Sequence, residues 1–316
     1  MKAMVIREFG GPEVFEERTL GQPPIRPNDL LVQVKATSVN PVDISIREAG
    51  QGAGVQPPAV IGYDVSGVIT DLGDSVSDFV VGQEVFYTPH ILGGAGSYAE
   101  YHAVDESIVA LKPENLSHAE AASLPLAGCT AWEGLVERAK LRVGETVLIH
   151  GCGGVGSLAL QIAKTAGAEV FVTCSDSMAE TAEALGADLA IDYKTGDFVP
   201  IVEEATDGFG VDVVYDTVGG NTLTRSLDVI KPYGRMVGIV STDTGFKDAF
   251  RNNIAIYTYF LERDRYKVDA LRILAERDEL EPVIDSVMPL SEVAEAHRRL
   301  EDGGVRGKIV LSVDAE

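Results

Sequence analysis

The stretch Val147-Leu-Ile-His-Gly151-Cys-Gly153-Gly-Val-Gly156-Ser-Leu-Ala-Leu-Gln-Ile-Ala-Lys164 decides the fold. It opens with a short β-branched and apolar run, typical of a buried strand, and closes with apolar residues at helical spacing. The glycines between them fit the pattern G-x-G-x-x-G. Gly151 permits a sharp turn, Gly153 lets the backbone approach a pyrophosphate, and Gly156 lets the helix pack against the strand. The amide-rich start of the helix then faces the anion.

The same glycine spacing also occurs in plain structural turns. Here a strand and a helix flank it correctly, and further strand and helix units follow, so the sequence favours dinucleotide binding. The predicted strands are 146–150, 169–173, 189–192, 212–216 and 235–240, and the predicted helices lie near 154–166, 177–186, 198–205 and 221–230. This alternation predicts parallel pairing with right-handed crossovers, which is a doubly wound α/β sheet. Residues 254–260 are a candidate sixth strand, and a helix is expected near 266–278.

The N-terminal part of the chain has a different pattern. Residues 1–38 and several segments up to 111 read as strands without intervening helices, so we expect a separate barrel-like domain. A short helix begins after Asn40, with Asn40 as N-cap and Pro41 at the first helical position. A mostly helical stretch from 118 to 138 is broken at Pro125. The tail from 281 to 313 reads as strand, helix and strand.

We therefore expect three segments. Residues 1–122 form the first part of a β-rich domain, residues 123–260 form a dinucleotide-binding domain, and residues 261–316 return to the β-rich domain. Apolar residues make up 45% of the 316 residues, which is enough for a full core.

The net charge of -23 disfavours nucleic-acid backbones and anionic membranes as partners. No run approaches the roughly 18 apolar residues of a membrane helix. The N-terminus lacks the apolar core of a signal peptide, and the three cysteines form no CxxC pair, so we expect a reducing cytoplasm. The acidic surface indicates adaptation to high salt, although ordinary solubility charge is an alternative reading.

The choice between the two nicotinamide dinucleotides depends on the end of the second strand. NAD needs an acidic residue there for its ribose 2′-hydroxyl, whereas a 2′-phosphate needs that acid absent. Ser175, which is small and uncharged, lies close to the expected spacing of about 20 residues after the glycine loop. This favours NADP(H), with Tyr193 and Lys194 able to reach the phosphate. Against it stand the adjacent Asp176 and the reading of Tyr193 and Lys194 as ordinary surface residues.

Taken together, the motifs resemble the medium-chain dehydrogenase/reductase superfamily, in its zinc-free quinone oxidoreductase (zeta-crystallin-like) branch. The resemblance covers nearly the whole chain and implies a GroES-like catalytic domain and a Rossmann domain with the active site in the cleft between them. It rests on Phe9-Gly-Gly-Pro-Glu13, Asn40-Pro-Val-Asp43, Gly62-Tyr-Asp-Val-Ser-Gly67, Gly96-Ser-Tyr-Ala-Glu100, Leu124-Pro-Leu126, Thr130-Ala-Trp132, Gly151-Cys-Gly-Gly-Val-Gly156, Gly186-Ala-Asp188, Asp216-Thr-Val-Gly-Gly220 and Gly307-Lys-Ile-Val310.

The resemblance also bears on zinc. Zinc-dependent relatives place Cys, then His-Glu, then a late Cys or Asp around a catalytic metal. This chain has Asn40 at the first position and Tyr63-Asp64 at the second, and a possible Cys129 cannot complete a three-ligand site. We therefore expect no metal. Without a Lewis acid, the expected reaction is hydride delivery from NADPH to a quinone or an α,β-unsaturated carbonyl compound, whose oxyanion needs hydrogen-bond donors and a proton source.

The resemblance implies roles for three residues of the catalytic domain. Asn40 could donate to a substrate carbonyl, or act only as the helix N-cap. Tyr63, in the former metal-ligand zone, is a candidate donor or proton source, with core packing as the alternative. Asp43 is expected to order its loop rather than to transfer protons.

The resemblance also implies a cofactor site in the Rossmann domain. The glycine loop should cradle the pyrophosphate, Ser175 and Tyr193 should hold the 2′-phosphate end, and the later loops should line the nicotinamide and its ribose. The candidate cofactor residues are Thr130, Gly153, Gly154, Val155, Gly156, Ser175, Tyr193, Lys194, Val218, Gly219, Ile239, Val240, Ser241 and Phe260.

One departure from the family concerns the loop 51–56, which has no aromatic residue to face a quinone. It leaves room for a smaller enone or an enoyl thioester. Two other functions stay open: an NADPH-binding protein without turnover, in a crystallin-like or redox-sensing role, and a zinc-free alcohol dehydrogenase. The family also implies a homodimer. The segment 254–260 could pair with its twin, or it could be an edge strand buried under its own domain.

Overall fold

The computed structural model describes residues 1–240 and 247–313 of the chain. The chain divides into two compact units, and each is described by itself. The β-rich unit comprises residues 1–129, 263–278 and 282–316, and the α/β unit comprises residues 130–262 and 279–281. No helix of the described residues is long and apolar enough to cross a membrane.

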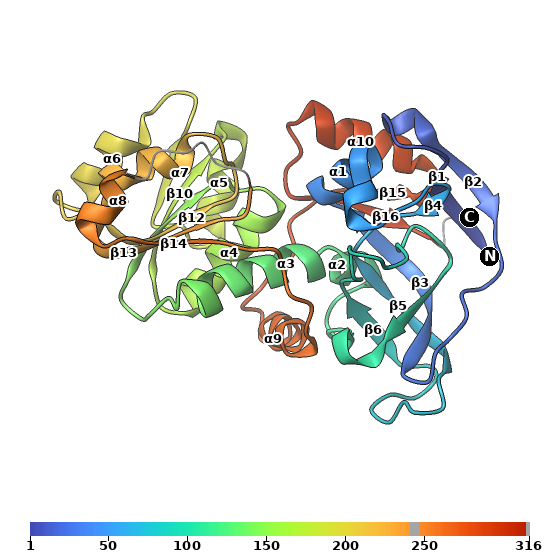
Figure 1. Cartoon of the computed structure of the whole chain (residues 1–316). Helices are drawn as coiled ribbons and strands as arrows, with labels where there is room; N and C mark the ends of the chain where they lie inside the picture. Colours follow the sequence, from blue (N-terminus) through green and yellow to red (C-terminus); the bar gives the residue numbers. More distant parts are fainter. Residues whose placement is uncertain (241–246, 314–316) are drawn as a thin grey trace. The chain divides into compact units, whose positions relative to one another are not determined.

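The α/β unit (Figure 1) is built on a six-stranded sheet of order β11-β10-β9-β12-β13-β14, in which all neighbouring strands are parallel. The strands are β9 (Thr146–His150), β10 (Glu169–Cys174), β11 (Leu189–Asp192), β12 (Val211–Asp216), β13 (Ile230–Gly238) and β14 (Ala255–Thr258). The helices are α4 (Gly154–Thr165), α5 (Asp176–Ala184), α6 (Phe198–Ala205), α7 (Thr222–Arg225) and α8 (Lys247–Asn252). The predicted doubly wound sheet is confirmed, and its strand order reverses between β9 and β12.

The start of β13 differs from the prediction. The strand begins at Ile230 rather than at 235, and the helix predicted near 221–230 is only α7 followed by a 3-10 turn, Ser226–Asp228. Tyr233 has φ 66°, and the pairing of β12 with β13 is irregular between Val211 and Val213. The sequence Lys231-Pro-Tyr-Gly234 reads as a turn because its Pro and Gly interrupt the apolar pattern, which hides the beginning of the strand.

Apolar residues of the central strands form the core of the α/β unit. Leu148, Val214 and Met236, from three neighbouring strands, are fully buried in one cluster, together with Leu223 of α7. Parallel strands covered on both faces have near-continuous apolar sequences, which is why the sequence predicts these strands.

The β-rich unit contains a three-stranded sheet of order β2-β1-β4 and a larger sheet of order β15-β16-β3-β5-β6-β8, to which β7 adds beside β3. The strands are β1 (Lys2–Ile6), β2 (Phe15–Thr19), β3 (Asp29–Val39), β4 (Ala59–Val60), β5 (Val65–Leu72), β6 (Glu84–Tyr87), β7 (Tyr101–Asp105), β8 (Ala110–Leu111), β15 (Ile284–Pro289) and β16 (Lys308–Ser312). The helices are α1 (Pro41–Ala49), α2 (His118–Ala122), α9 (Arg265–Glu276) and α10 (Val293–Asp302). Helix α3 (Pro125–Trp132) begins at the predicted break, and its residues 130–132 belong to the α/β unit.

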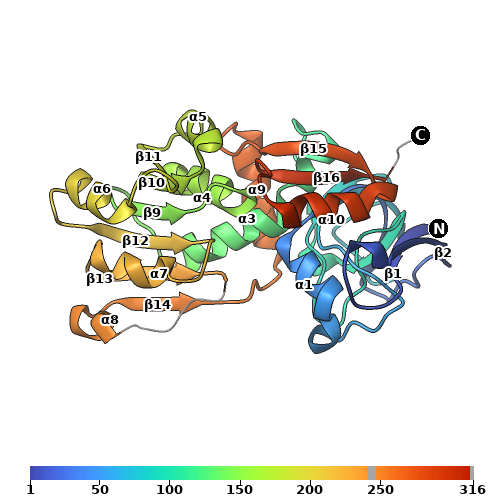
Figure 2. The same ribbon diagram turned by 90° about the horizontal axis from the view of Figure 1, so that it is seen from above.

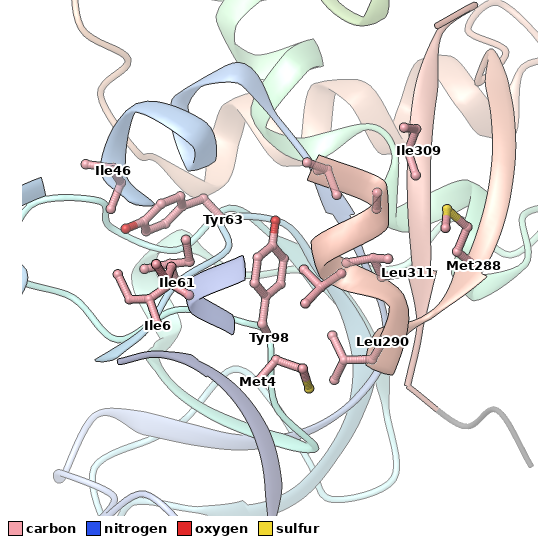
Figure 3. Packing of buried hydrophobic residues seen from close by; sticks show 14 of the residues in the cluster. Met4, Ile6, Ile46, Ile61, Tyr63, Tyr98, Met288, Leu290, Ile309 and Leu311 are labelled. Atoms are coloured by element: carbon pink, nitrogen blue, oxygen red, sulfur yellow. The ribbon is translucent and has the colours of Figure 1, made fainter. Parts of the chain in front are cut away.

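The tail from 282 onwards belongs to the β-rich unit. Strand β16 pairs antiparallel with β3, with Ile309 opposite Val39, and Figure 2 shows α10 beside β15 and β16. Figure 3 shows the core that results, in which Ile309 and Leu311 from the tail pack in one cluster with Ile61 and Tyr98 from the N-terminal part. This pairing places the first residue of β16 beside the end of β3.

Candidate active site

Asn40 lies between the end of β3 and the start of α1. Its backbone is extended, with φ -125° and ψ 153°, and Pro41 opens the helix as predicted. The Asp43 carboxylate accepts the Asn40 backbone N–H at 2.8 Å, so the helix start is closed by Asp43. The Asp43 backbone N–H donates to the Asn40 carbonyl at 2.9 Å, and the Asn40 side chain forms hydrogen bonds with Asp64 and Lys308. Asn40 therefore holds the N-cap position with its backbone, while its amide group is used elsewhere.

The Asn40 amide is held between a carboxylate and an ammonium group. Its Nδ2 donates to Asp64 Oδ2 at 2.7 Å, and its Oδ1 accepts from Lys308 Nζ. A carboxylate can only accept and an ammonium group can only donate, so these two partners fix which way the amide points. Among the described residues, Nδ2 donates only to Asp64, so its second N–H is left for another acceptor.

The Asp64 carboxylate is fully buried and well supplied with donors. Ser38 Oγ donates to Oδ2 at 2.6 Å, the Leu126 backbone N–H donates to Oδ1 at 2.7 Å, and Lys308 Nζ lies 3.4 Å from Oδ2. A buried charge is tolerated only when it is paired and hydrogen-bonded, and this carboxylate is both.

Lys308 reaches Asn40 because β16 begins beside the end of β3. The preceding Gly307 has φ 98°, and a Cβ there would lie 2.2 Å from the Val283 carbonyl oxygen, so only glycine fits. Lys308 is 5% exposed, and its Nζ also donates to the Val39 carbonyl at 3.2 Å. Its three N–H groups thus have three acceptors: Val39 O, Asn40 Oδ1 and Asp64 Oδ2.

Asp43 belongs to a second buried network. Its Oδ2 accepts from the Asn40 N–H and from the Tyr98 hydroxyl, both at 2.8 Å, while its Oδ1 has no partner among the described residues. Burial raises the pKa of Asp43 to about 7. The Tyr98 hydroxyl also contacts His297 Nε2 at 3.1 Å, and His297 Nδ1 contacts Arg47 Nη1 at 3.2 Å. These contacts tie Asp43 in place, which fits the ordering role expected for it.

Tyr63 lies in the core cluster of the β-rich unit and is 1% exposed. Figure 3 shows its phenol ring against Ile46 and Ile61. Burial, together with the negative charge of Asp43, raises the pKa of Tyr63 above its ordinary value. This placement corresponds to the core-packing alternative; a role in proton transfer stays a prediction.

The glycine loop follows β9 at the point where the strand order reverses. A Cβ at Gly156 would lie 1.8 Å from the Gly151 carbonyl oxygen, and one at Gly151, where φ is 89°, would lie 2.6 Å from Thr217 Oγ1. A Cβ at Gly153 would meet nothing within 4 Å among the described residues. Gly153 is the N-cap of α4, and Gly154, Val155 and Gly156 form its first turn. The loop thus leaves open space at the helix start, and it fits a pyrophosphate.

The residues predicted for the 2′-phosphate end lie together at the carboxyl ends of β10 and β11. Ser175 is the N-cap of α5, and Cys174 and Asp192 are paired in the sheet. The Tyr193 backbone N–H donates to the Cys174 carbonyl at 3.2 Å, and the Lys194 N–H donates to Asp192 Oδ1 at 3.0 Å. Tyr193 and Lys194 are both exposed.

The remaining predicted cofactor residues follow the other parallel strands. The backbone N–H groups of Val218 and Gly219, after β12, donate to Asp216 Oδ1 at 2.8 and 3.1 Å. Ile239 and Val240 follow β13, and Phe260 follows β14 and is 53% exposed. Thr130 lies on α3, where its carbonyl accepts from the hydroxyls of Tyr215 and Tyr259. Ser241 lies outside the described residues.

Comparison with known proteins agrees with this fold. Residues 26–114 match the family model "Alcohol dehydrogenase GroES-like domain", and residues 185–311 match "Zinc-binding dehydrogenase". The chain is 37% identical to the chloroplastic NADPH-dependent alkenal/one oxidoreductase of Arabidopsis thaliana, over 98% of this chain and 79% of that protein. It is 31% identical to the quinone oxidoreductase of Homo sapiens, over 98% and 97%.

A solved structure has the same fold. The quinone oxidoreductase from Coxiella burnetii superposes with a TM-score of 0.91 at 33% identity, over 99% of both chains. The chain therefore belongs to the medium-chain dehydrogenase/reductase superfamily. Within it, the relatives named here are quinone oxidoreductases and an alkenal/one oxidoreductase.

One of the family descriptions names zinc, and the donor set at Asn40 does not fit that ion. The Asn40 amide oxygen and the Asp64 carboxylate both accept from the Lys308 ammonium. A catalytic zinc ion takes three nitrogen, sulfur or oxygen ligands and leaves no room for a cation among them. Lys308 thus supplies the positive charge at this place.

Sequence reasoning missed the parts played by Asp64 and Lys308. Lys308 appeared only within the motif Gly307-Lys-Ile-Val310, and Asp64 only within Gly62-Tyr-Asp-Val-Ser-Gly67 and beside Tyr63 at the second metal-ligand position of the zinc-dependent relatives. One signal was available: Lys308 opens an otherwise apolar strand, and a buried lysine needs a partner.

Proposed function

We propose that this protein is a zinc-independent oxidoreductase that uses NADPH to reduce a quinone or an α,β-unsaturated carbonyl compound. The observation that carries the proposal is the Asn40 amide, which is fixed by Asp64 and Lys308 with one N–H to spare. NADPH, when bound, supplies a hydride. The second Asn40 N–H donates to the substrate oxygen and stabilises the negative charge that develops there. The names of the relatives from Arabidopsis and human support the same reaction class.

The glycine loop and the ends of the parallel strands would hold the cofactor. Gly153 and the first turn of α4 would bind the pyrophosphate through backbone N–H groups. Ser175, Tyr193 and Lys194 would bind the 2′-phosphate, with Lys194 as the cation. The order of acceptors among quinones, enones and enoyl thioesters depends on the loop 51–56, which lacks aromatic residues.

A screen of NADPH and NADH oxidation against quinones, enones and enoyl thioesters, at low and high salt, tests the proposal. NADPH should be oxidised faster than NADH with at least one of these acceptors. Tight NADPH binding without turnover across the panel would instead support a crystallin-like or redox-sensing role. Alcohol-dependent reduction of NADP+ would support a zinc-free alcohol dehydrogenase.

We also propose a homodimer formed through β14. This strand is the last in the sheet order, and its outer edge pairs with no other strand of the described residues. An unpaired edge can extend a sheet across a two-fold axis. Light scattering after gel filtration should give twice the mass of the 316-residue chain, and Ile256→Pro should give a monomer. A monomeric wild-type protein would overturn this assignment.

We propose a cytoplasmic protein adapted to high salt. Its three cysteines are free and buried, which suits a reducing compartment, and its net charge is -23. Self-repulsion at this charge destabilises the compact state and is screened by salt. The melting temperature should therefore rise between 0.1 and about 2 M KCl, where the Debye length falls from about 10 Å to a few Å. A melting temperature independent of KCl would contradict adaptation to high salt. The negative charge would then be an ordinary solubility charge.

A further inference from the structure

We propose that Lys308 is a positioning residue, which holds and polarises the Asn40 amide so that its second N–H points to the substrate oxygen. The inference rests on the proposed function and adds to it a residue from the C-terminal strand. The chain places Lys308 and Asn40 268 positions apart, and the pairing of β16 with β3 brings them together.

Lys308 cannot itself serve the substrate, because all its N–H groups are used. They meet the Val39 carbonyl at 3.2 Å, the Asn40 amide oxygen, and Asp64 Oδ2 at 3.4 Å. A lysine ammonium has three donors and no acceptor. Its effect on the reaction therefore passes through Asn40.

The effect has two parts. A rotated amide would place its oxygen against the Asp64 carboxylate and lose its present hydrogen bonds to Asp64 and Lys308. Lys308 raises the cost of that rotation, because the reversed amide would present N–H groups to an ammonium. In addition, the cation withdraws electron density from the amide oxygen, and hydrogen bonds in a chain strengthen one another in a low-dielectric interior. The remaining N–H becomes a stronger donor.

Lys112 provides a matched control in the same unit. It is 8% exposed, it donates to the carbonyl groups of Pro113 and Leu116, and its Nζ lies 3.2 Å from Glu84. Lys308→Met and Lys112→Met each remove a buried, ion-paired ammonium, but only Lys308 contacts Asn40. Lys308→Arg keeps the charge and the donors.

The experiment compares wild type, Lys308→Met, Lys308→Arg and Lys112→Met by kcat and KM with the best acceptor, by NADPH affinity, and by side-chain amide NMR. The chain has six asparagines, so asparagine-labelled protein gives a simple spectrum in which Asn40→Asp identifies the Asn40 signals. Lys308→Met should lower kcat about tenfold, less than the roughly 100-fold expected for loss of the donor itself, because the Asn40 amide remains, with NADPH affinity within about twofold of wild type. Lys308→Arg should recover part of kcat, and Lys112→Met should retain it.

The NMR measurement separates this inference from the proposed function. In wild type, the two Nδ2 protons of Asn40 should differ strongly in chemical shift, and Lys308→Met should reduce that difference. If the wild type reduces no acceptor, the proposed function fails while the NMR result still decides the positioning role. If Lys308→Met keeps kcat within about threefold of wild type, or leaves the Asn40 signals unmoved, the positioning role is wrong. Should Lys308→Met not fold, Lys308→Arg and Asp64→Asn give the same two readouts.

Discussion

His297 Nε2 lies 3.1 Å from the hydroxyl of Tyr98, although the two residues are 199 positions apart in the chain. Arg47 contacts the other ring nitrogen at 3.2 Å, and arginine can only donate, so His297 must accept at Nδ1 and carry its hydrogen on Nε2. The Tyr98 hydroxyl accepts this hydrogen and donates its own to Asp43. His297, a neutral histidine of α10, thus holds Asp43 in place through Tyr98. The Asp43 carboxylate in turn accepts the Asn40 N–H at the start of α1.

The first prediction concerns the stability of this network in acid. Burial, reinforced by the Arg47 charge, lowers the pKa of His297 from 6.5 to about 3. The unfolded chain therefore binds more protons than the folded chain below pH 6.5. The stabilisation is present above pH 6.5 and is lost as the pH falls towards 3. The free energy of unfolding, measured by urea titration, should be lower at pH 5 than at pH 7.5.

His297→Gln isolates this contribution. Glutamine can accept from Arg47 and donate to Tyr98, but it does not titrate. Burial also lowers the pKa of His102 to about 4 and that of His150 to about 3, so part of the acid sensitivity should persist in the variant. The slope of stability against pH should be shallower in His297→Gln than in wild type. Equal slopes would show that His297 is not the buried neutral group described.

The second prediction concerns Asp43, whose effect on stability has the opposite sign. Burial raises the pKa of Asp43 from 3.8 to about 7, so the folded chain binds more protons between these values. Stability from this group is lost as the pH rises through that range. Asp43→Asn removes the titration while keeping an acceptor for Asn40 and Tyr98. The stability of the variant relative to wild type should increase from pH 5 to pH 8; a constant difference would contradict the raised pKa.

The third prediction separates the roles of two glycines in the loop after β9. A Cβ at Gly153 meets open space, so Gly153→Ala should fold with a melting temperature near that of wild type and bind NADPH at least tenfold more weakly. A Cβ at Gly156 would lie 1.8 Å from a carbonyl oxygen, so Gly156→Ala should lose stability as well as NADPH affinity. Fluorescence titration and thermal melting measure both effects. Normal NADPH affinity in Gly153→Ala would remove this loop from the cofactor site.

The fourth prediction concerns the choice of dinucleotide. Lys194 is exposed at the carboxyl end of β11, in the loop next to Ser175. Lys194→Ala should weaken NADPH binding about tenfold, since a charge-assisted bond to phosphate contributes roughly 1.5 kcal/mol, and should leave NADH binding unchanged. Lys231→Ala serves as a control, because Lys231 forms an ion pair with Asp212 on another part of the α/β unit. Equal losses for both dinucleotides would show that Lys194 does not read the 2′-phosphate.

The sequence was most informative where one local pattern determined one element. The run from Val147 to Lys164 predicted β9, the glycine loop and α4, because strand, turn and helix periodicities all lie within it. The sequence pattern did not predict the start of β13 at Ile230, because Pro and Gly interrupt its apolar residues. The contact of Asn40 with Lys308 could not be read from spacing, because it depends on how β16 pairs with β3. The motifs identified both segments, and only the fold showed that Asn40 and Lys308 are in contact.

The most direct test of the central claim is the rate of NADPH oxidation, at saturating enone or quinone, by protein treated with a chelator and shown by elemental analysis to hold no metal. The wild type should keep its full rate. Asn40→Ala should lose about 100-fold in kcat with unchanged NADPH affinity, because one oxyanion donor is removed. Activity that disappears with the metal and returns with zinc, or Asn40→Ala turnover within about threefold of wild type, would contradict the account.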